Sequence, residues 1–127
     1  LESEEAILKL KETNATLLSQ TVLLKGVNDN VEALKSLFLR LAELDVQPYY
    51  LHHPDQAKGA MHFYLPIEEG RKIYGKLRNI LPGWAIPQYI IDIPGGEGKT
   101  NAFNPEKYEF SGNLINKEGK PIKYLTE

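Results

Sequence analysis

The sequence predicts an α/β fold in which strands and helices alternate along the chain. Three apolar runs, at 16–24, 46–51 and 84–93, are separated by two segments with helical periodicity. Helical connections of this kind join parallel strands through right-handed crossovers. The carboxyl ends of the three strands would then lie on one side of the sheet, where α/β proteins place their chemistry.

The composition is typical of one modest globular domain. The 127 residues are 42% hydrophobic and 25% charged, and the net charge is −2, which does not favour nucleic acid as a partner. The chain has no cysteine, which excludes disulfides and thiolate metal ligands within it. No apolar run approaches the ~20 residues that span a bilayer. We therefore expect a cytoplasmic protein without a membrane partner.

The first strand carries a polar interruption that could serve a ligand. Residues 3–11 form a short predicted helix that stops at Asn14, and residues 16–24 follow as a nearly continuous apolar run. Such a run predicts a strand buried on both faces, as in a parallel sheet. Gln20 interrupts it, and its amide either forms hydrogen bonds in the core or faces a ligand.

Two amphipathic helices are predicted to cover the sheet. Asp29 and Glu32 have the spacing of a capping box at the start of the first of these two helices. Its apolar face carries Leu34, Leu37, Phe38, Leu41 and Leu44. Pro66 suits the first turn of the second helix, which ends before Pro82.

All three histidines follow the second strand. His52, His53 and His62 surround Asp55, and histidine with aspartate can bind zinc or iron. The spacing matches no strong metal motif, and adjacent histidines at a strand end point to opposite sides. A metal site formed by His52, Asp55 and His62 remains one alternative.

A glycine-rich loop follows the third strand. Its final Gly-Lys-Thr repeats the end of a phosphate-binding loop, but Ile93 stands where that motif requires its first glycine. The segment after Thr100 is also a poor helix start, whereas the motif needs a helix N-terminus to hold the phosphate. The phosphate-loop interpretation therefore fails. The loop instead presents Lys99 at the end of a strand, seven residues after Asp92.

The segment after Pro105 has a different pattern. Apolar and polar residues alternate on both sides of residues 116–120, which predicts a β-hairpin. The apolar positions are Tyr108, Phe110, Leu114, Ile122 and Tyr124. We therefore divide the chain into an α/β unit at 1–105 and a hairpin tail at 106–127.

Three landmarks, in this order and spacing, resemble the C-terminal portion of the lysine 2,3-aminomutase family. They are residues 19–29, residues 48–51 with Asp55, Gly59 and His62, and residues 92–99. The resemblance covers about residues 3–100. It implies the last part of a partial TIM-type (β/α) barrel, in a radical S-adenosylmethionine enzyme that also uses pyridoxal phosphate. It further implies a homo-oligomer for the full-length protein.

The resemblance assigns a role to four residues. Lys99 matches the lysine that forms the internal aldimine with pyridoxal phosphate. Asp55 and Asp92 match the two carboxylates that hold the side-chain ammonium of the substrate lysine, and Gln20 matches a polar residue near S-adenosylmethionine. The implied enzyme is an isomerase that moves the α-amino group of lysine, or of another basic amino acid, to the β-carbon by a radical mechanism.

Several departures limit what this chain can do alone. The 4Fe-4S cluster of such enzymes needs a three-cysteine loop, so its ligands would lie outside this chain, and the fragment is expected to be inactive. The arginines for the cofactor phosphate and the substrate carboxylate are expected upstream. His52-His53-Pro54 replaces the aromatic and cysteine context of the clostridial enzymes. The family branch that modifies a translation factor fits the loop before Lys99 less well.

The alternative function is a small non-catalytic α/β module that binds a ligand or partner through its glycine loop.

Overall fold

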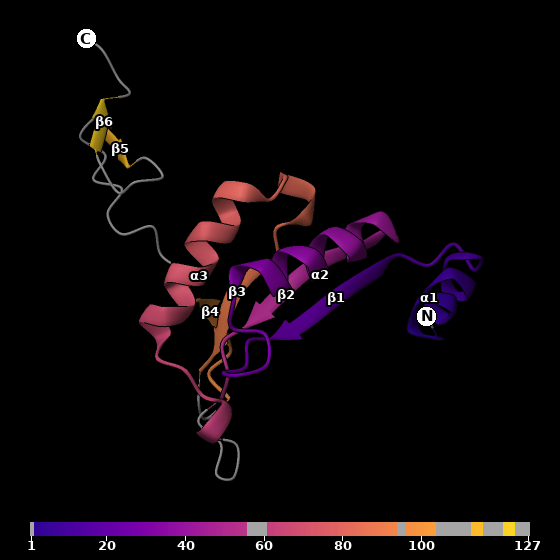
Figure 1. The fold of residues 1–127 in the computed structure, drawn as a ribbon, viewed down its shortest axis with the longest axis horizontal. Helices are drawn as coiled ribbons and strands as arrows, with labels where there is room; N and C mark the ends of the chain where they lie inside the picture. Colours follow the sequence, from indigo (N-terminus) through magenta and orange to yellow (C-terminus); the bar gives the residue numbers. More distant parts are fainter. Residues whose placement is uncertain (1, 56–60, 94–95, 104–112, 116–120, 124–127) are drawn as a thin grey trace.

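The computed structural model describes residues 2–55, 61–93, 96–103, 113–115 and 121–123. It confirms the alternation of helices and strands that the sequence predicts (Figure 1). The main elements are α1 (Glu2–Lys11), β1 (Leu17–Val22), α2 (Val31–Glu43), β2 (Val46–His52), α3 (Ile67–Ile80), β3 (Gln88–Asp92) and β4 (Lys99–Asn101). Two 3-10 turns, Met61–Phe63 and Gly83–Ala85, precede α3 and β3. The third strand is therefore shorter than the predicted 84–93.

The four strands form one sheet in the order β1-β2-β3-β4. β1, β2 and β3 are parallel, as predicted. β4 was not predicted: it runs antiparallel to β3, and Lys99 pairs with Asp92. Gly96 and Gly98 have φ angles of 76° and 96°, which a residue with a side chain rarely adopts, and they let the chain reverse direction. The glycine loop is thus the turn of a β-hairpin.

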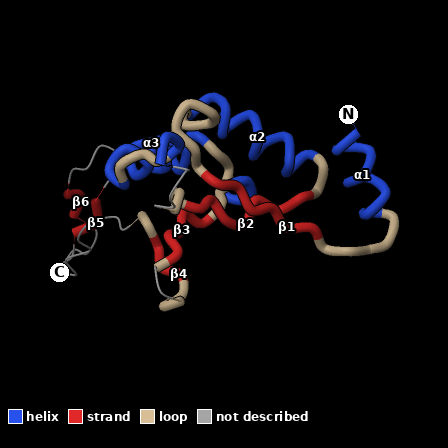
Figure 2. The backbone as a smooth tube through the Cα atoms, turned by 90° about the horizontal axis from the view of Figure 1, so that it is seen from below, coloured by secondary structure: helices blue, strands red, loops and turns tan. Residues whose placement is uncertain are grey.

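α2 and α3 cover one face of the sheet, and the core lies between them and the strands (Figures 1 and 2). The cluster of buried residues includes Leu23, Leu34, Phe38, Leu51, Leu65, Tyr74, Leu77 and Tyr89. The predicted apolar face of α2 is confirmed for Leu34 and Phe38, whereas Leu37 is 38% exposed at its margin. Apolar periodicity therefore locates the helices and most of their packing surface.

The helix caps differ from prediction in one detail. The side chain of Asn30 accepts a hydrogen bond from the Ala33 N–H at 2.8 Å and caps α2. Asp29 instead accepts from the Gly26 N–H at 3.0 Å, inside the preceding turn. The predicted capping box with Asp29 is therefore wrong by one residue, because Asn30 has the extended backbone that an N-cap requires.

The second face of the sheet is not covered by a helix in the described part of the chain (Figure 2). Along β1, exposed and partly buried residues alternate, and Leu18 and Val22 are 52% and 45% exposed. The prediction that β1 is buried on both faces is wrong, because helices cover one face of the sheet and not the other among the residues that the structure describes. A helix layer on one face is consistent with an α/β fragment, and the partial barrel stays a prediction.

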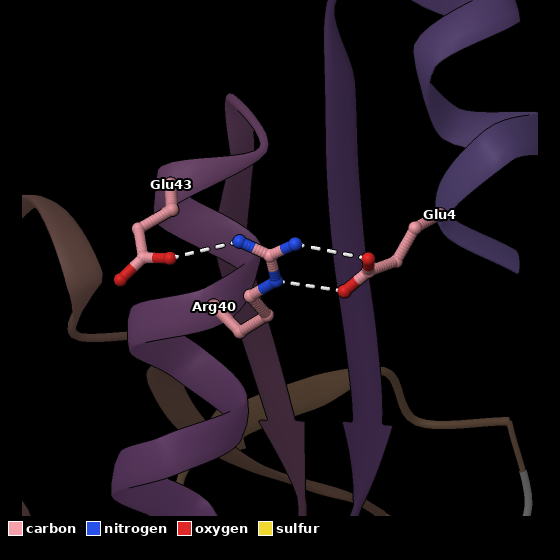
Figure 3. A network of polar contacts seen from close by, with 3 residues as sticks. All are labelled: Glu4, Arg40 and Glu43. Carbon is pink, nitrogen blue, oxygen red and sulfur yellow. Dashed lines mark hydrogen bonds and ion pairs between the residues drawn. The ribbon is translucent and has the colours of Figure 1, made fainter. Parts of the chain in front are cut away.

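α1 is attached to the rest of the fold mainly by charge. None of its ten residues, all of them described, is buried. The guanidinium of Arg40 on α2 donates from Nε and Nη2 to both carboxylate oxygens of Glu4, at 2.7 and 2.9 Å, and its Nη1 reaches Glu43 at 2.9 Å (Figure 3). Lys11 pairs with Asp45 at 2.6 Å.

The C-terminal tail contains a second, two-stranded sheet. β5 (Asn113–Ile115) and β6 (Pro121–Lys123) pair antiparallel, which agrees with the predicted hairpin. Its turn at 116–120, together with Tyr108, Phe110 and Tyr124, lies outside the described residues. The division at 105/106 stays a prediction. Within the described residues, no helix has both the length and the apolar character that a membrane span requires.

Candidate active site

Polar side chains meet at the carboxyl edge of the parallel strands. Gln20 lies in β1, His52 ends β2, and Asp92 ends β3. The sheet register aligns these strand ends, because His52 pairs with Val22 on one side and with Ile90 on the other. The turn after β3 then returns Lys99 to the position opposite Asp92. Topology therefore brings together three of the four residues that the sequence assigns to the site.

His52 connects these residues into one chain of contacts. Its Nε2 lies 3.0 Å from Oε1 of Gln20, and its Nδ1 lies 3.2 Å from Oδ2 of Asp92. The other oxygen of that carboxylate, Oδ1, lies 3.3 Å from the Nζ of Lys99. The sequence left the role of His52 open. Its position at the end of a strand flanked by two other strand ends is the signal that could have identified it.

The site is open enough to receive a ligand. The exposed fractions of the His52, Asp92 and Lys99 side chains are 13%, 39% and 50%. Exposure therefore increases from the histidine toward the lysine. An amine and a carboxylate that are accessible from the same side can bind a ligand that carries both an electrophilic group and a cation.

Charge neighbours keep Asp92 ionised. Partial burial raises the pKa of Asp92, but the contacts with Lys99 and His52 outweigh that effect and hold the pKa below its ordinary value. A carboxylate in this state attracts cations at neutral pH. If the Lys99 amine moves away, the Asp92 carboxylate can bind the ammonium group of a ligand in its place.

The ring of Tyr50 packs against His52, beside this chain of contacts. Its ring lies edge-on to His52, with centroids 5.6 Å apart, and is 4.4 Å from the ring of Tyr49. A hydrogen bond with Tyr49 and partial burial raise the pKa of Tyr50, while the positive charge of Lys99 opposes that rise. The positive charge of Lys99 therefore lowers the pKa of both Tyr50 and Asp92, against the effects that raise it.

His53 points away from the site, into the core. It is 1% exposed, and its Nδ1 lies 2.6 Å from the hydroxyl of Tyr89. Burial lowers the pKa of His53, which favours a neutral imidazole. The prediction that the adjacent histidines point to opposite sides is confirmed, and His53 has a structural place behind the site.

The structure does not bring Asp55 and His62 into the same cluster. Asp55 is exposed and makes no hydrogen bond or ion pair to His52, Asp92 or Lys99, and all four residues are described. The ring of His62 instead packs on Phe63, with centroids 3.9 Å apart. Among the described residues, no three His, Cys, Asp or Glu side chains lie close enough to hold a metal ion, so the proposed His52, Asp55 and His62 site does not form.

A cavity of about 460 Å³ lies at the opposite, amino end of the strands, lined by Leu17, Asp45, Val46 and Trp84 among others. Its lining includes none of Gln20, His52, Asp92 and Lys99. We place the candidate site at the carboxyl edge, because an ionised carboxylate, an amine and an imidazole converge there.

The fold and this cluster define an α/β unit with an amine–carboxylate site at the carboxyl edge of its sheet. Comparison with known proteins identifies its relatives, although no protein-family model matches the chain. A protein of Aquifex aeolicus, provisionally named L-lysine 2,3-aminomutase, is 46% identical over 97 residues, which are 76% of this chain and 26% of that protein. The L-lysine 2,3-aminomutases of Fusobacterium nucleatum and Clostridium subterminale are each 39% identical over 99 residues, 78% of this chain and 23% and 24% of those proteins.

The chain therefore belongs to the lysine 2,3-aminomutase family. It spans about a quarter of the length of the curated relatives that it matches, so it corresponds to a portion of such a protein. The family prediction from the sequence is confirmed. The roles of Lys99, Asp92, Asp55 and Gln20 stay predictions.

Proposed function

We propose that the parent protein is an amino-acid 2,3-aminomutase that acts on lysine or another basic amino acid, and that this chain supplies part of its active site. The observation that carries the proposal is the contact between Lys99 and Asp92 at the carboxyl edge of the sheet. It occurs in a chain whose relatives, at 38–46% identity, are named lysine 2,3-aminomutases.

The reaction is an isomerisation with no net change in atoms. The amino group moves from C2 to C3 of the substrate, and one hydrogen atom moves from C3 to C2. When bound, pyridoxal phosphate would provide the group that holds the migrating nitrogen, and S-adenosylmethionine with a 4Fe-4S cluster would provide the radical chemistry. The protein must bind and orient the substrate, and keep water away from the reacting carbons.

Lys99 fits the role of the residue that holds pyridoxal phosphate. Its side chain is 50% exposed, so a ligand can approach the amine. The amine lies 3.3 Å from Oδ1 of Asp92. Binding a carbonyl compound requires the neutral amine, so we expect the ion pair to break as the cofactor binds.

Asp92 fits the role of a contact for the substrate's side-chain ammonium. Its Oδ1 already faces the ammonium of Lys99 at 3.3 Å, which stands in for that group. Asp55, which follows the end of β2, would supply the second carboxylate. Two carboxylates around one ammonium favour basic amino acids and disfavour neutral ones, whose binding would leave the carboxylates unpaired.

The residues present do not fit the iron–sulfur cluster. The cluster is bound by cysteine thiolates, and this chain has no cysteine. The cluster ligands would therefore lie outside this chain, and we expect the 127 residues alone to be inactive. Gln20 has an exposed amide, which fits a contact with S-adenosylmethionine. The face of the sheet that no helix covers among the described residues is called the open face.

The test is an isomerisation assay of the full-length protein, purified anaerobically and supplied with pyridoxal phosphate and S-adenosylmethionine. We expect conversion of lysine to β-lysine, and Asp92→Asn should lower kcat/KM for lysine by about 10- to 100-fold, because a charge-assisted contact is lost. Lys99→Ala should abolish both turnover and the visible absorption of the bound cofactor. The matched control is Asp45→Asn, an exposed carboxylate at the other end of the sheet. A wild-type protein that isomerises no amino acid would leave the non-catalytic module as the better account.

A further inference from the structure

We infer that His52 is a positioning residue, which holds the Asp92 carboxylate so that its free oxygen faces the ammonium of the substrate. The inference rests on the proposed function, because it assigns to His52 a part in substrate recognition at that same site. It goes beyond the residues that the sequence assigned to the substrate and cofactors, since His52 was considered there only as a ligand of a metal site that does not form among the described residues.

The two oxygens of Asp92 have separate partners. Oδ2 accepts from the Nδ1 side of His52 at 3.2 Å, and Oδ1 faces the ammonium of Lys99 at 3.3 Å. If the Lys99 amine is withdrawn to hold a cofactor, Oδ1 becomes available to the substrate, while His52 keeps Oδ2 in place. Asp92 ends its strand and is 39% exposed, so without His52 its carboxylate could turn away.

His52 is well placed to hold another side chain, because it is itself held on two sides. It is the least exposed member of the chain of contacts, at 13%. Its second nitrogen, Nε2, lies 3.0 Å from Oε1 of Gln20, and the ring of Tyr50 packs edge-on against it. The imidazole therefore has little freedom to rotate, and its contact with Asp92 is preorganised.

The contact also favours the ionised carboxylate. With oxygen acceptors at both ring nitrogens, the imidazole donates from Nδ1 to Asp92 and from Nε2 to Gln20 when it carries both protons. The groups that face His52 are Asp92, Gln20 and Tyr50, with Lys99 beyond the carboxylate. An N–H aimed at Oδ2 holds the carboxylate in the form that attracts a substrate cation.

Three substitutions in the full-length enzyme, loaded with its cofactors, separate this role from a general structural one. His52→Asn places an amide N–H near the position of Nδ1 and keeps a donor for Asp92. His52→Gln places its amide near the position of Nε2, toward Gln20, and loses the donor to Asp92. His52→Phe keeps a ring and loses both donors. His62→Ala is the control, because that exposed histidine is outside the chain of contacts.

We expect the KM for lysine to rise about 10-fold in the Gln and Phe variants, and to stay within about 3-fold of wild type in the Asn variant and the His62→Ala control. The effect should fall on KM more than on kcat, because the lost contact orients a carboxylate that binds the unreacting end of the substrate. The visible absorption of the bound cofactor should be the same in all four proteins. A purely structural role would lower activity in the Asn and Gln variants alike.

The inference is overturned if the Gln variant keeps the wild-type KM, or if the Asn variant loses affinity as much as the Gln variant does. Comparison of the Asn and Gln variants of His52 tests the inference even if the Phe variant fails to fold. Failure of the proposed function is a different result: the wild-type enzyme itself would not isomerise lysine, and this inference would fall with it.

Discussion

At the scale of single residues, the direction of two adjacent side chains separates function from packing. His52 faces the open side of the sheet and contacts Asp92 and Gln20, whereas His53 is buried against Tyr89. The alternation of side chains along a strand causes this difference, since successive Cβ atoms point to opposite faces. The same alternation places Gln20 on the open face.

Gly70 shows how tightly the buried side of this arrangement is packed. A Cβ atom at this position would lie 2.0 Å from the hydroxyl oxygen of Tyr89, which is the group that contacts His53. In the same helix, a Cβ atom at Gly75 would lie 3.7 Å from Phe103, an ordinary contact distance. The two glycines therefore lie in the same helix and differ in the space that is available for a side chain.

We predict opposite effects of alanine at these two sites. Gly70→Ala should lower the free energy of unfolding by about 1–3 kcal/mol, because the clash outweighs the ~1 kcal/mol that alanine gains over glycine in a helix. Gly75→Ala should raise it by about 0.5–1 kcal/mol. Urea unfolding of both variants measures the difference. Equal stabilisation by both substitutions would show that Tyr89 moves aside freely.

At the scale of secondary-structure elements, local patterns predicted most of the fold. Apolar periodicity located α2 and α3, and the apolar runs located the three parallel strands. β4 was missed because it has only three residues, Lys-Thr-Asn, with no apolar pattern, and it exists through pairing with β3. The two-faced burial of β1 was wrong because an apolar run does not reveal which covering layers a chain contains.

α1 differs from the other helices because ionic contacts attach it. The pairing with Arg40 lowers the pKa of Glu4 from its ordinary value of 4.5 to about 2. A carboxyl with a lowered pKa in the folded state stabilises that state above its ordinary value, and the contribution is lost as pH falls through the lowered value. The attachment of α1 should therefore persist at pH 5 and weaken between about pH 4.5 and pH 2.

The Arg40→Leu substitution tests this attachment. We predict that the pKa of Glu4 returns toward 4.5 in this variant, and that the amide protons of α1 exchange faster while those of α3 do not change. A carboxyl titration by NMR and hydrogen exchange measure the two effects. Lys72→Leu, an exposed cation on α3, is the control. Unchanged exchange in α1 would mean that other contacts hold it.

At the scale of the whole molecule, one face of the sheet carries the helices and the other carries the candidate site. The topology of parallel strands made part of the site predictable, because Gln20 lies in β1, Asp92 ends β3 and Lys99 follows β3, and the carboxyl ends of these strands share one edge. The position of His52 at a strand end could be seen in the sequence, but its contacts with Gln20 and Asp92 depend on the register of three strands. The lack of a contact between Asp55 and this cluster was equally hidden, because the sequence does not tell how the chain leaves β2.

The open face also carries apolar side chains that water contacts directly. Leu18 and Val22 of β1 are about half exposed there. Exposed apolar groups beside an uncovered strand favour association with another surface.

We predict that the isolated 127-residue chain self-associates through this face, and that Leu18→Lys shifts it toward the monomer. Sedimentation velocity at several concentrations measures the change. Leu10→Lys, at an exposed position on α1, is the matched control and should have a smaller effect. A wild-type chain that stays monomeric at high concentration would contradict the prediction.

Chemical labelling of the bound cofactor can show whether Lys99 holds pyridoxal phosphate in the active site of the parent protein. The full-length protein is loaded with pyridoxal phosphate, reduced with borohydride, digested, and analysed by mass spectrometry for the modified lysine. We predict one pyridoxyl group per chain, attached to Lys99, and none after Lys99→Ala. A protein that acquires no label, or whose label lies on a different lysine, would show that Lys99 does not hold the cofactor.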